Sequence, residues 1–162
     1  MSDRANALAD QFEKANSEFV SMLEGLSDEQ WQTNLDGEGW PIGVGACHVA
    51  EHYNNLALLV DVAANGKPIP DWAPKSSGDL DKLNAEIAAR NAGHGKDEAL
   101  GMLRSNAGRV VSQLKSLSDE QLDRQSVLPM GGQFSVEQIA HMMLIGHIGM
   151  HAPSIRKAAG QN

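Results

Sequence analysis

The 162-residue chain contains a single cysteine, Cys47, and no long apolar run. One cysteine cannot form an intrachain disulfide, and it excludes both a cysteine-built zinc site and a dithiol redox centre. No segment approaches the roughly 18 uncharged apolar residues that a membrane helix needs, and the N-terminus lacks the apolar core of a signal peptide. We therefore expect a cytoplasmic protein without a membrane partner, in which any metal is held mainly by histidines and carboxylates.

Basic residues are also scarce, because 13 Lys and Arg stand against 21 Asp and Glu, for a net charge of −8. The basic residues are scattered rather than gathered into a patch, so a nucleic acid is a poor candidate partner. A small-molecule or protein partner fits this composition better. The length and the 41% apolar content suit one compact domain over residues 1–162.

Apolar residues spaced three and four apart predict four long amphipathic helices, and no strand-like alternation competes with them. The first helix carries Ala5, Leu8, Phe12, Ala15, Phe19 and Met22. The second follows Pro41 with Val49, Tyr53, Leu56, Val60 and Ala63. The third carries Leu100, Leu103, Ala107, Val110, Leu114 and Leu117. The fourth, capped by Ser135, carries Val136, Ala140, Met143, His147, Met150 and Ser154.

Connections between these helices predict how they are arranged. Residues 65–78 hold three prolines and two glycines, which is typical of a long connection, and a minor helix follows at residues 79–92. The sequence "LSDEQ" occurs after the first and after the third long helix. It indicates either a duplication or a recurrent helix cap. Two helical hairpins joined by this long crossover predict an all-α four-helix bundle.

Two pairs of histidines are spaced four residues apart, namely His48 with His52 and His147 with His151. On a helix this spacing separates side chains by about 40° and 6 Å, so both members can face one point. His147 occupies a position of the predicted apolar stripe. Inward imidazoles need a hydrogen-bond partner or a cation, and one Zn²⁺, Ni²⁺ or Fe²⁺ ion on three imidazoles would satisfy them. The alternative is a set of core histidines bonded to carbonyls and water.

Neighbouring residues limit the chemistry of such a site. "HIGMH" has Ile148 where the HExxH motif has its glutamate, so a metalloprotease is disfavoured. We expect His141 to face another surface and His94, between two glycines, to face solvent. Glu51 and His52 are either groups that face the site or part of an exposed polar face. The Cys47 side chain points about 100° away from His48.

Three segments resemble the DinB/YfiT-like superfamily of small helical metalloproteins. "GEGWPIGVGACHVAEH" resembles the family's tryptophan-containing loop and the helix with a ligand histidine, and "SVEQIAHMMLIGHIGMHAPSI" resembles its His-x-x-x-His helix. "LDKLNAEIAARNAGHGKDEAL" is similar to the middle of many members. The resemblance therefore covers nearly the whole chain.

This resemblance implies a bundle in up-down-down-up order, a homodimer, and one divalent metal on His48, His147 and His151. It leaves His52 as a residue that lines the site. Family members commonly have a second histidine immediately before the second-helix ligand, and here that position is Cys47.

The activity that the resemblance implies is thiol chemistry, because characterised relatives include isomerases and S-transferases that use a low-molecular-weight thiol. The metal would keep an open position where a thiol binds as thiolate, with His52 or Glu51 as proton acceptor. The same position could instead activate water for hydrolysis. A third reading is a non-catalytic bundle that binds a metal or a ligand. Trp40 and Trp72 either line the site or seal the ends of the bundle.

Overall fold

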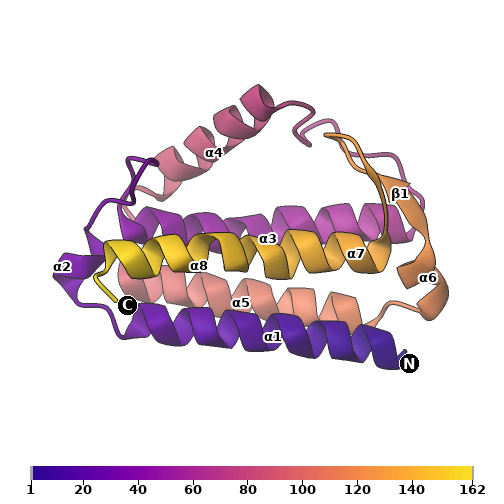
Figure 1. Cartoon of the computed structure of the whole chain (residues 1–162), viewed down its shortest axis with the longest axis horizontal. Coiled ribbons are helices and arrows are strands. Elements are labelled where there is room, and N and C mark those ends of the chain that lie inside the picture. The colour runs from indigo at the N-terminus through magenta and orange to yellow at the C-terminus, as the bar shows by residue number, and fades with distance from the viewer. Residues whose placement is uncertain (1, 162) are drawn as a thin grey trace.

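Four long helical segments form the body of the molecule (Figure 1). The computed structural model describes residues 2–161. The first three segments are α1 (Asp3–Glu24), α3 (Ile42–Ala64) and α5 (Lys96–Lys115). The fourth is continuous through α7 (Val136–Ala140), the π-helical turn η1 (His141–Ile145) and α8 (Gly146–Ala158). Short helices are α2 (Asp28–Trp31), α4 (Ser77–Asn91) and α6 (Asp119–Asp123).

The helices run in the order that the resemblance implies. Along the long axis of Figure 1, α1 and the α7–α8 segment run in one direction, and α3 and α5 run in the other. Helix α5 packs against both α1 and α3, and α3 also packs against α7, α8 and α4. The crossover between α3 and α5 contains α4. The predicted all-α bundle with its up-down-down-up order and long crossover is confirmed.

Serine residues begin several of these helices. Ser27 and Ser118, the serines of the two "LSDEQ" segments, each form a reciprocal capping box with the glutamine three residues later. Ser135 does the same at the start of α7. Because each capping box satisfies two otherwise unpaired backbone donors, the repeated segment works as a helix cap. Its origin in a duplication stays a hypothesis.

A short hairpin, β1 (Gln125–Val127) and β2 (Gln133–Ser135), lies where the sequence predicted only a loop. The strands pair antiparallel with Ser126 opposite Phe134. Gly131 and Gly132 take positive φ values of 99° and 87° in the connection, a conformation that glycine adopts without strain. Strands of three residues are too short to show the alternation from which a strand is predicted.

The buried stripe of the fourth segment also differs from the prediction. Its buried residues are Val136, Ile139, Ala140, Leu144, Ile148 and Ile155. Met150, predicted to be buried, is 68% exposed, whereas Ile148 is 4% exposed. The wider π turn of η1 takes about one more residue than an α turn, so the core positions move from 143 and 147 to 144 and 148. Met143 and His147 consequently line a cavity beside the core.

Candidate metal centre

A cavity of about 600 Å³ opens between α3, α4 and the fourth helical segment. The loop residues Gly37, Glu38, Trp40, Trp72 and Pro74 and the β1–β2 turn complete its walls. Trp40 and Trp72, the two tryptophans considered in the sequence, both line this cavity. The ring centroid of Trp40 lies 5.5 Å from that of His48. Both tryptophans therefore line the cavity that contains the histidines, and their part in a functional site stays a prediction. No helix within residues 2–161 is long and apolar enough to cross a membrane.

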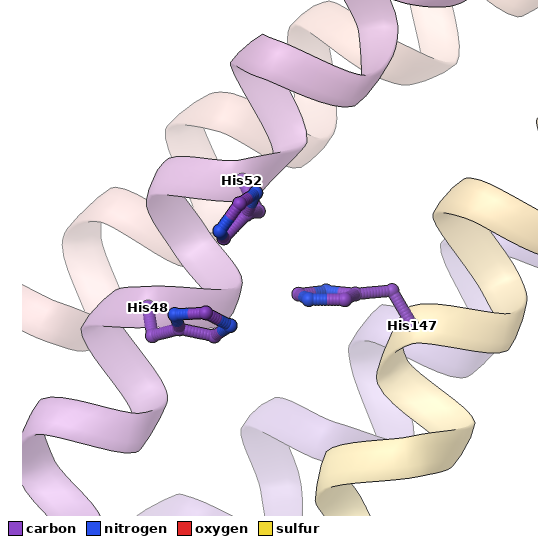
Figure 2. A group of neighbouring side chains, drawn as sticks. All are labelled: His48, His52 and His147. Atoms are coloured by element: carbon purple, nitrogen blue, oxygen red, sulfur yellow. The ribbon is translucent and has the colours of Figure 1, made fainter. Parts of the chain in front are cut away.

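The structure brings together all four histidines of the two predicted pairs. Figure 2 shows His48 and His52 on α3 facing His147 on α8. The ring centroid of His147 lies 5.3 Å from that of His48 and 5.1 Å from that of His52. The His151 ring lies 4.6 Å from His147 and 4.8 Å from His48. Spacing of four residues on two facing helices therefore produces one cluster.

Potential ligand atoms within this cluster are close enough for one ion. One nitrogen each of His48, His52 and His147 lie within 4.8 Å of one another. This group shares His48 and His147 with the set that the resemblance implies, and it differs in the third member, where His52 stands in place of His151. The pair common to both sets joins α3 to α8.

The ring nitrogens of the four histidines differ in their hydrogen bonding. His52 Nε2 lies 3.2 Å from Asn84 Oδ1, an acceptor, so a hydrogen bond at this contact requires the tautomer with its proton on Nε2 and its lone pair on Nδ1. His151 Nδ1 lies 4.0 Å from Glu38 Oε1. Within residues 2–161, the buried Nδ1 atoms of His48 and His147 have no hydrogen-bond partner.

Burial keeps the histidines of the cluster uncharged. It lowers the pKa of His48 to about 3 and that of His147 to about 2, and the neighbouring imidazoles lower both further. Burial also lowers the pKa values of His52 and His151. At neutral pH four imidazoles therefore present lone pairs rather than positive charges. A divalent cation such as Zn²⁺ is bound by neutral imidazole nitrogens whose lone pairs are free. The buried, unpaired nitrogens and the neutral rings of this cluster therefore fit such an ion.

Glu38 is a site residue that the sequence analysis missed. Its Oε2 is buried and has no hydrogen-bond partner in the described part of the chain, and burial raises the pKa of its carboxyl group. The residue stands between Gly37 and Gly39, whose φ values of 81° and 72° are both positive. The only signal for this residue in the sequence was the glycine-rich loop around it. Its place beside His151 depends on how that loop folds.

Glu51, a candidate proton acceptor, lies outside the cavity lining. Its carboxylate accepts hydrogen bonds from Arg90 Nε and Asn91 Nδ2, each at 2.7 Å. Burial favours the neutral acid, but the bonds from Arg90 and Asn91 outweigh it and lower the pKa of Glu51. The negative charge of Glu51 in turn raises the pKa of His52, against the larger effect of burial. Glu51 therefore influences His52 through its charge.

The remaining candidates lie away from the cluster. Cys47 is fully buried with Sγ 3.9 Å from His94 Nδ1, and burial raises the pKa of its thiol to about 12. His94, expected to face solvent, is half-buried by this contact and lies 3.4 Å from Glu98. His141 is exposed and borders a separate surface depression beside Arg4, as predicted.

Known structures share this architecture at low sequence identity. The mycothiol-dependent maleylpyruvate isomerase superposes with a TM-score of 0.75 at 15% identity over 96% of this chain. This chain spans 63% of the length of that protein. DfsB, described as a sibling lethal factor precursor, has a TM-score of 0.74 at 20% identity over 97% of this chain and 95% of its own.

A further match is YfiT from Bacillus subtilis, described as a probable metal-dependent hydrolase with an unusual four-helix bundle topology. It has a TM-score of 0.70 and 16% identity, and it covers 100% of this chain and 91% of its own. No curated protein matches the chain significantly. The family model of the DinB superfamily matches residues 11–155. Because that match covers most of the sequence, the chain belongs to the DinB superfamily.

Proposed function

We propose that this protein is a divalent-metal-dependent enzyme of the DinB type, which transfers or isomerises a substrate with a low-molecular-weight thiol. The observation that carries the proposal is the cluster of four neutral imidazoles on the wall of a cavity of about 600 Å³. A bound Zn²⁺, Ni²⁺ or Fe²⁺ would act as a Lewis acid and lower the pKa of a thiol at its open position.

His48 and His147 supply two of the ligands in this proposal, since they belong to both candidate sets and have unpaired Nδ1 atoms. We propose His151 as the third ligand. A carboxylate behind an imidazole makes it a stronger ligand, and the Glu38 carboxylate lies 4.0 Å from His151. His52 is the competing third ligand, because its nitrogen is close to those of His48 and His147.

With His151 as a ligand, His52 is free to act as the proton acceptor. The Asn84 amide oxygen fixes the proton on Nε2 and leaves Nδ1 as the base. The thiol proton would then pass to Nδ1, and the sulfur would form its bond to an electrophilic carbon of the substrate. In a transfer the bond from that carbon to a leaving group would break, and the leaving group would depart with the electron pair. In an isomerisation the sulfur would add to a double bond, whose electron pair would take up a proton, and would leave again after rotation about the resulting single bond. Glu51, itself held by Arg90 and Asn91, favours the protonated imidazole through its charge.

Hydrolysis at the same site is the second candidate, because the metal would act on water as it does on a thiol. The description of YfiT as a probable metal-dependent hydrolase favours this candidate. A bundle that binds a metal or ligand without catalysis is the third. The homodimer and the cytoplasmic location expected from the sequence stay predictions.

An assay of thioether formation tests the proposal. Untagged protein is incubated with 1-chloro-2,4-dinitrobenzene and, in turn, mycothiol, bacillithiol or glutathione. We expect metal-dependent conjugation with at least one thiol, abolished in His147→Ala. Hydrolysis of nitrophenyl esters without added thiol would assign the hydrolase activity instead. Absence of turnover with every thiol and ester would contradict both enzymatic proposals and leave the binding bundle.

A further inference from the structure

Polar side chains are distributed unevenly over the walls of the cavity. On α3 and α4, apart from the histidines, they are Asn55, Asp81 and Asn84. The wall formed by the β1–β2 turn and the fourth helical segment, here called the apolar wall, adds no polar side chain except its histidines within residues 2–161. Its other side chains are those of Leu128, Pro129, Met130, Met143 and Met150. A ligand in the cavity therefore finds hydrogen-bonding partners on one wall only.

The three polar side chains of α3 and α4 lie beside His52, the proton acceptor of the proposed reaction. Asn84 Oδ1 is 3.2 Å from His52 Nε2. Asn55 follows His52 by three residues and Asp81 precedes Asn84 by three residues, a helix rise of about 4.5 Å in each case. Because α4 runs roughly opposite to α3, both residues are displaced in the same direction from the contact between Asn84 and His52 (Figure 1). The three side chains thus form a polar strip that begins at His52.

The polar strip presents both donors and acceptors to a ligand. Asn84 Oδ1 is the atom next to His52, so the amide NH₂ of Asn84 is a donor for another partner. Asn55 supplies a donor and an acceptor, and Asp81 supplies acceptors. Asn55 is half-buried and Asp81 is exposed, so a ligand in the cavity reaches both. An amide or a hydroxyl group, which also combines a donor with an acceptor, is the complement of such a strip.

A thiol that gives its proton to His52 has its sulfur at the beginning of the polar strip. The rest of the molecule extends from the sulfur along one of the two walls. Amide or hydroxyl groups placed against the apolar wall would lose their hydration without gaining hydrogen bonds. Placed along the polar strip, the same groups are paired.

We propose that Asn55, Asp81 and Asn84 form the subsite that recognises the thiol, and that this subsite selects for an amide or hydroxyl group in it. The inference rests on the proposed function, because it takes the sulfur to lie at the histidines and His52 to accept its proton. Asn55 and Asp81 touch the thiol directly, whereas Asn84 also positions the His52 imidazole. The apolar wall is left for the second substrate.

Two thiols of equal chain length test this selection. N-acetylcysteamine carries one amide, and pentane-1-thiol has methylene groups in its place. Each is titrated into the full-length protein loaded with Co²⁺, because the bond from Co²⁺ to a thiolate gives a charge-transfer band in the near ultraviolet. The quantity compared between variants is the ratio of the two affinities. This ratio cancels differences in acidity and hydrophobicity between the two thiols.

Asn55→Leu and Asp81→Ala each remove hydrogen-bonding groups of the polar strip. Each should lower the ratio of N-acetylcysteamine affinity to pentane-1-thiol affinity by about three- to tenfold, as expected for the loss of one hydrogen bond. Asn54→Leu and Glu86→Ala are the matched controls, because both residues are exposed on the same two helices and neither lines the cavity. The controls should keep the ratio of the original protein.

The outcomes separate this inference from the proposed function. A thiolate band with both thiols, and one ratio shared by the original protein, Asn55→Leu and Asp81→Ala, would refute the subsite and retain the proposed function. An equal fall of the ratio in the variants and their controls would also refute the subsite. Protein that binds no Co²⁺, or that gives no thiolate band with either thiol, would refute the thiol-binding metal centre and this inference with it.

Discussion

Glu38 is the side chain whose role depends most on tertiary structure. The side chain of Glu38 is half-buried, with its Oε1 4.0 Å from His151 Nδ1 and its Oε2 buried. Replacing it by Gln keeps the shape and removes the charge that supports the imidazole. We predict that Glu38→Gln weakens metal affinity by about 10- to 100-fold, measured by competition with a chelating dye.

The matched control for Glu38→Gln is Asp36→Asn in the same loop. Asp36 is paired with Lys157 at 2.9 Å, and both side chains are about three-quarters exposed. An exposed pair contributes little to stability, so this variant should keep the metal affinity of the original protein. Equal affinity in Glu38→Gln and Asp36→Asn would contradict the role of Glu38.

The third ligand is decided by two alanine variants. If His151 is the ligand, His151→Ala should lower metal affinity by about 100-fold or more, whereas His52→Ala should still bind close to one equivalent. Isothermal titration of chelator-treated protein with Zn²⁺ measures both affinities. The reverse order of effects would assign the third position to His52.

Spacing in the sequence predicted the histidine cluster because helical periodicity fixes which residues share a face. His48, His52, His147 and His151 were all identified in this way. Glu38 was not, because no periodic pattern connects a loop residue to a helix more than a hundred residues later. Contacts of this kind depend on the path of the loop.

At the scale of elements, the π turn η1 sets the rotation of the last helix. The extra residue in this turn moves Ile148 into the core and leaves His147 and His151 beside the cavity. The predicted stripe is correct at Val136 and Ala140 and wrong beyond the π turn, because the prediction was of a regular helix. A π turn leaves little trace in a pattern of apolar residues, since it changes the register by one position only.

Removing that extra residue should disrupt the site without removing the helix. Met142 is 42% exposed within η1, so its deletion costs little packing and restores an α turn. The deletion rotates His147 and His151 relative to the preceding turns by about 100°. We predict lost metal binding with near-native helical circular dichroism. Met142→Ala retains the residue count and should bind normally; equal metal binding by both variants would contradict this account of η1.

At the scale of the whole molecule, the long helices could be predicted because each has a continuous stripe that must be buried. Leu100, Leu103, Ala107, Val110, Leu114 and Leu117 are all buried as expected. The β1–β2 hairpin could not be predicted because its strands are only three residues long. The cavity could not be predicted because its lining comes from segments that are far apart in the sequence. The charge of the cavity, in contrast, agrees with the composition. Basic residues are scarce in the sequence, and none lines the cavity within residues 2–161.

Acid should destabilise the metal-free protein. The native pKa values of His48 and His147, about 3 and 2, lie below the ordinary value of 6.5. As the pH falls through about 6.5, the unfolded chain binds protons at these residues and the native state does not, so stability is lost progressively toward pH 3. The urea concentration at which half of the chelator-treated protein is unfolded should therefore be lower at about pH 5 than at about pH 7.5.

His147→Ala removes one of these two histidines and should reduce the change in urea midpoint between the two pH values. The comparison uses this change rather than the midpoint itself, because the substitution also alters packing. An unchanged midpoint over this pH range in the original protein would contradict the burial of neutral imidazoles.

The metal content of the protein purified without a histidine tag tests the central claim most directly. Elemental analysis by mass spectrometry should find about one equivalent of Zn, Ni or Fe per chain in the original protein. The same analysis should find the metal lost in His147→Ala, with the helical circular dichroism retained. Metal-free original protein that does not take up Zn²⁺, Ni²⁺ or Fe²⁺ on addition, while fully folded, would contradict the claim.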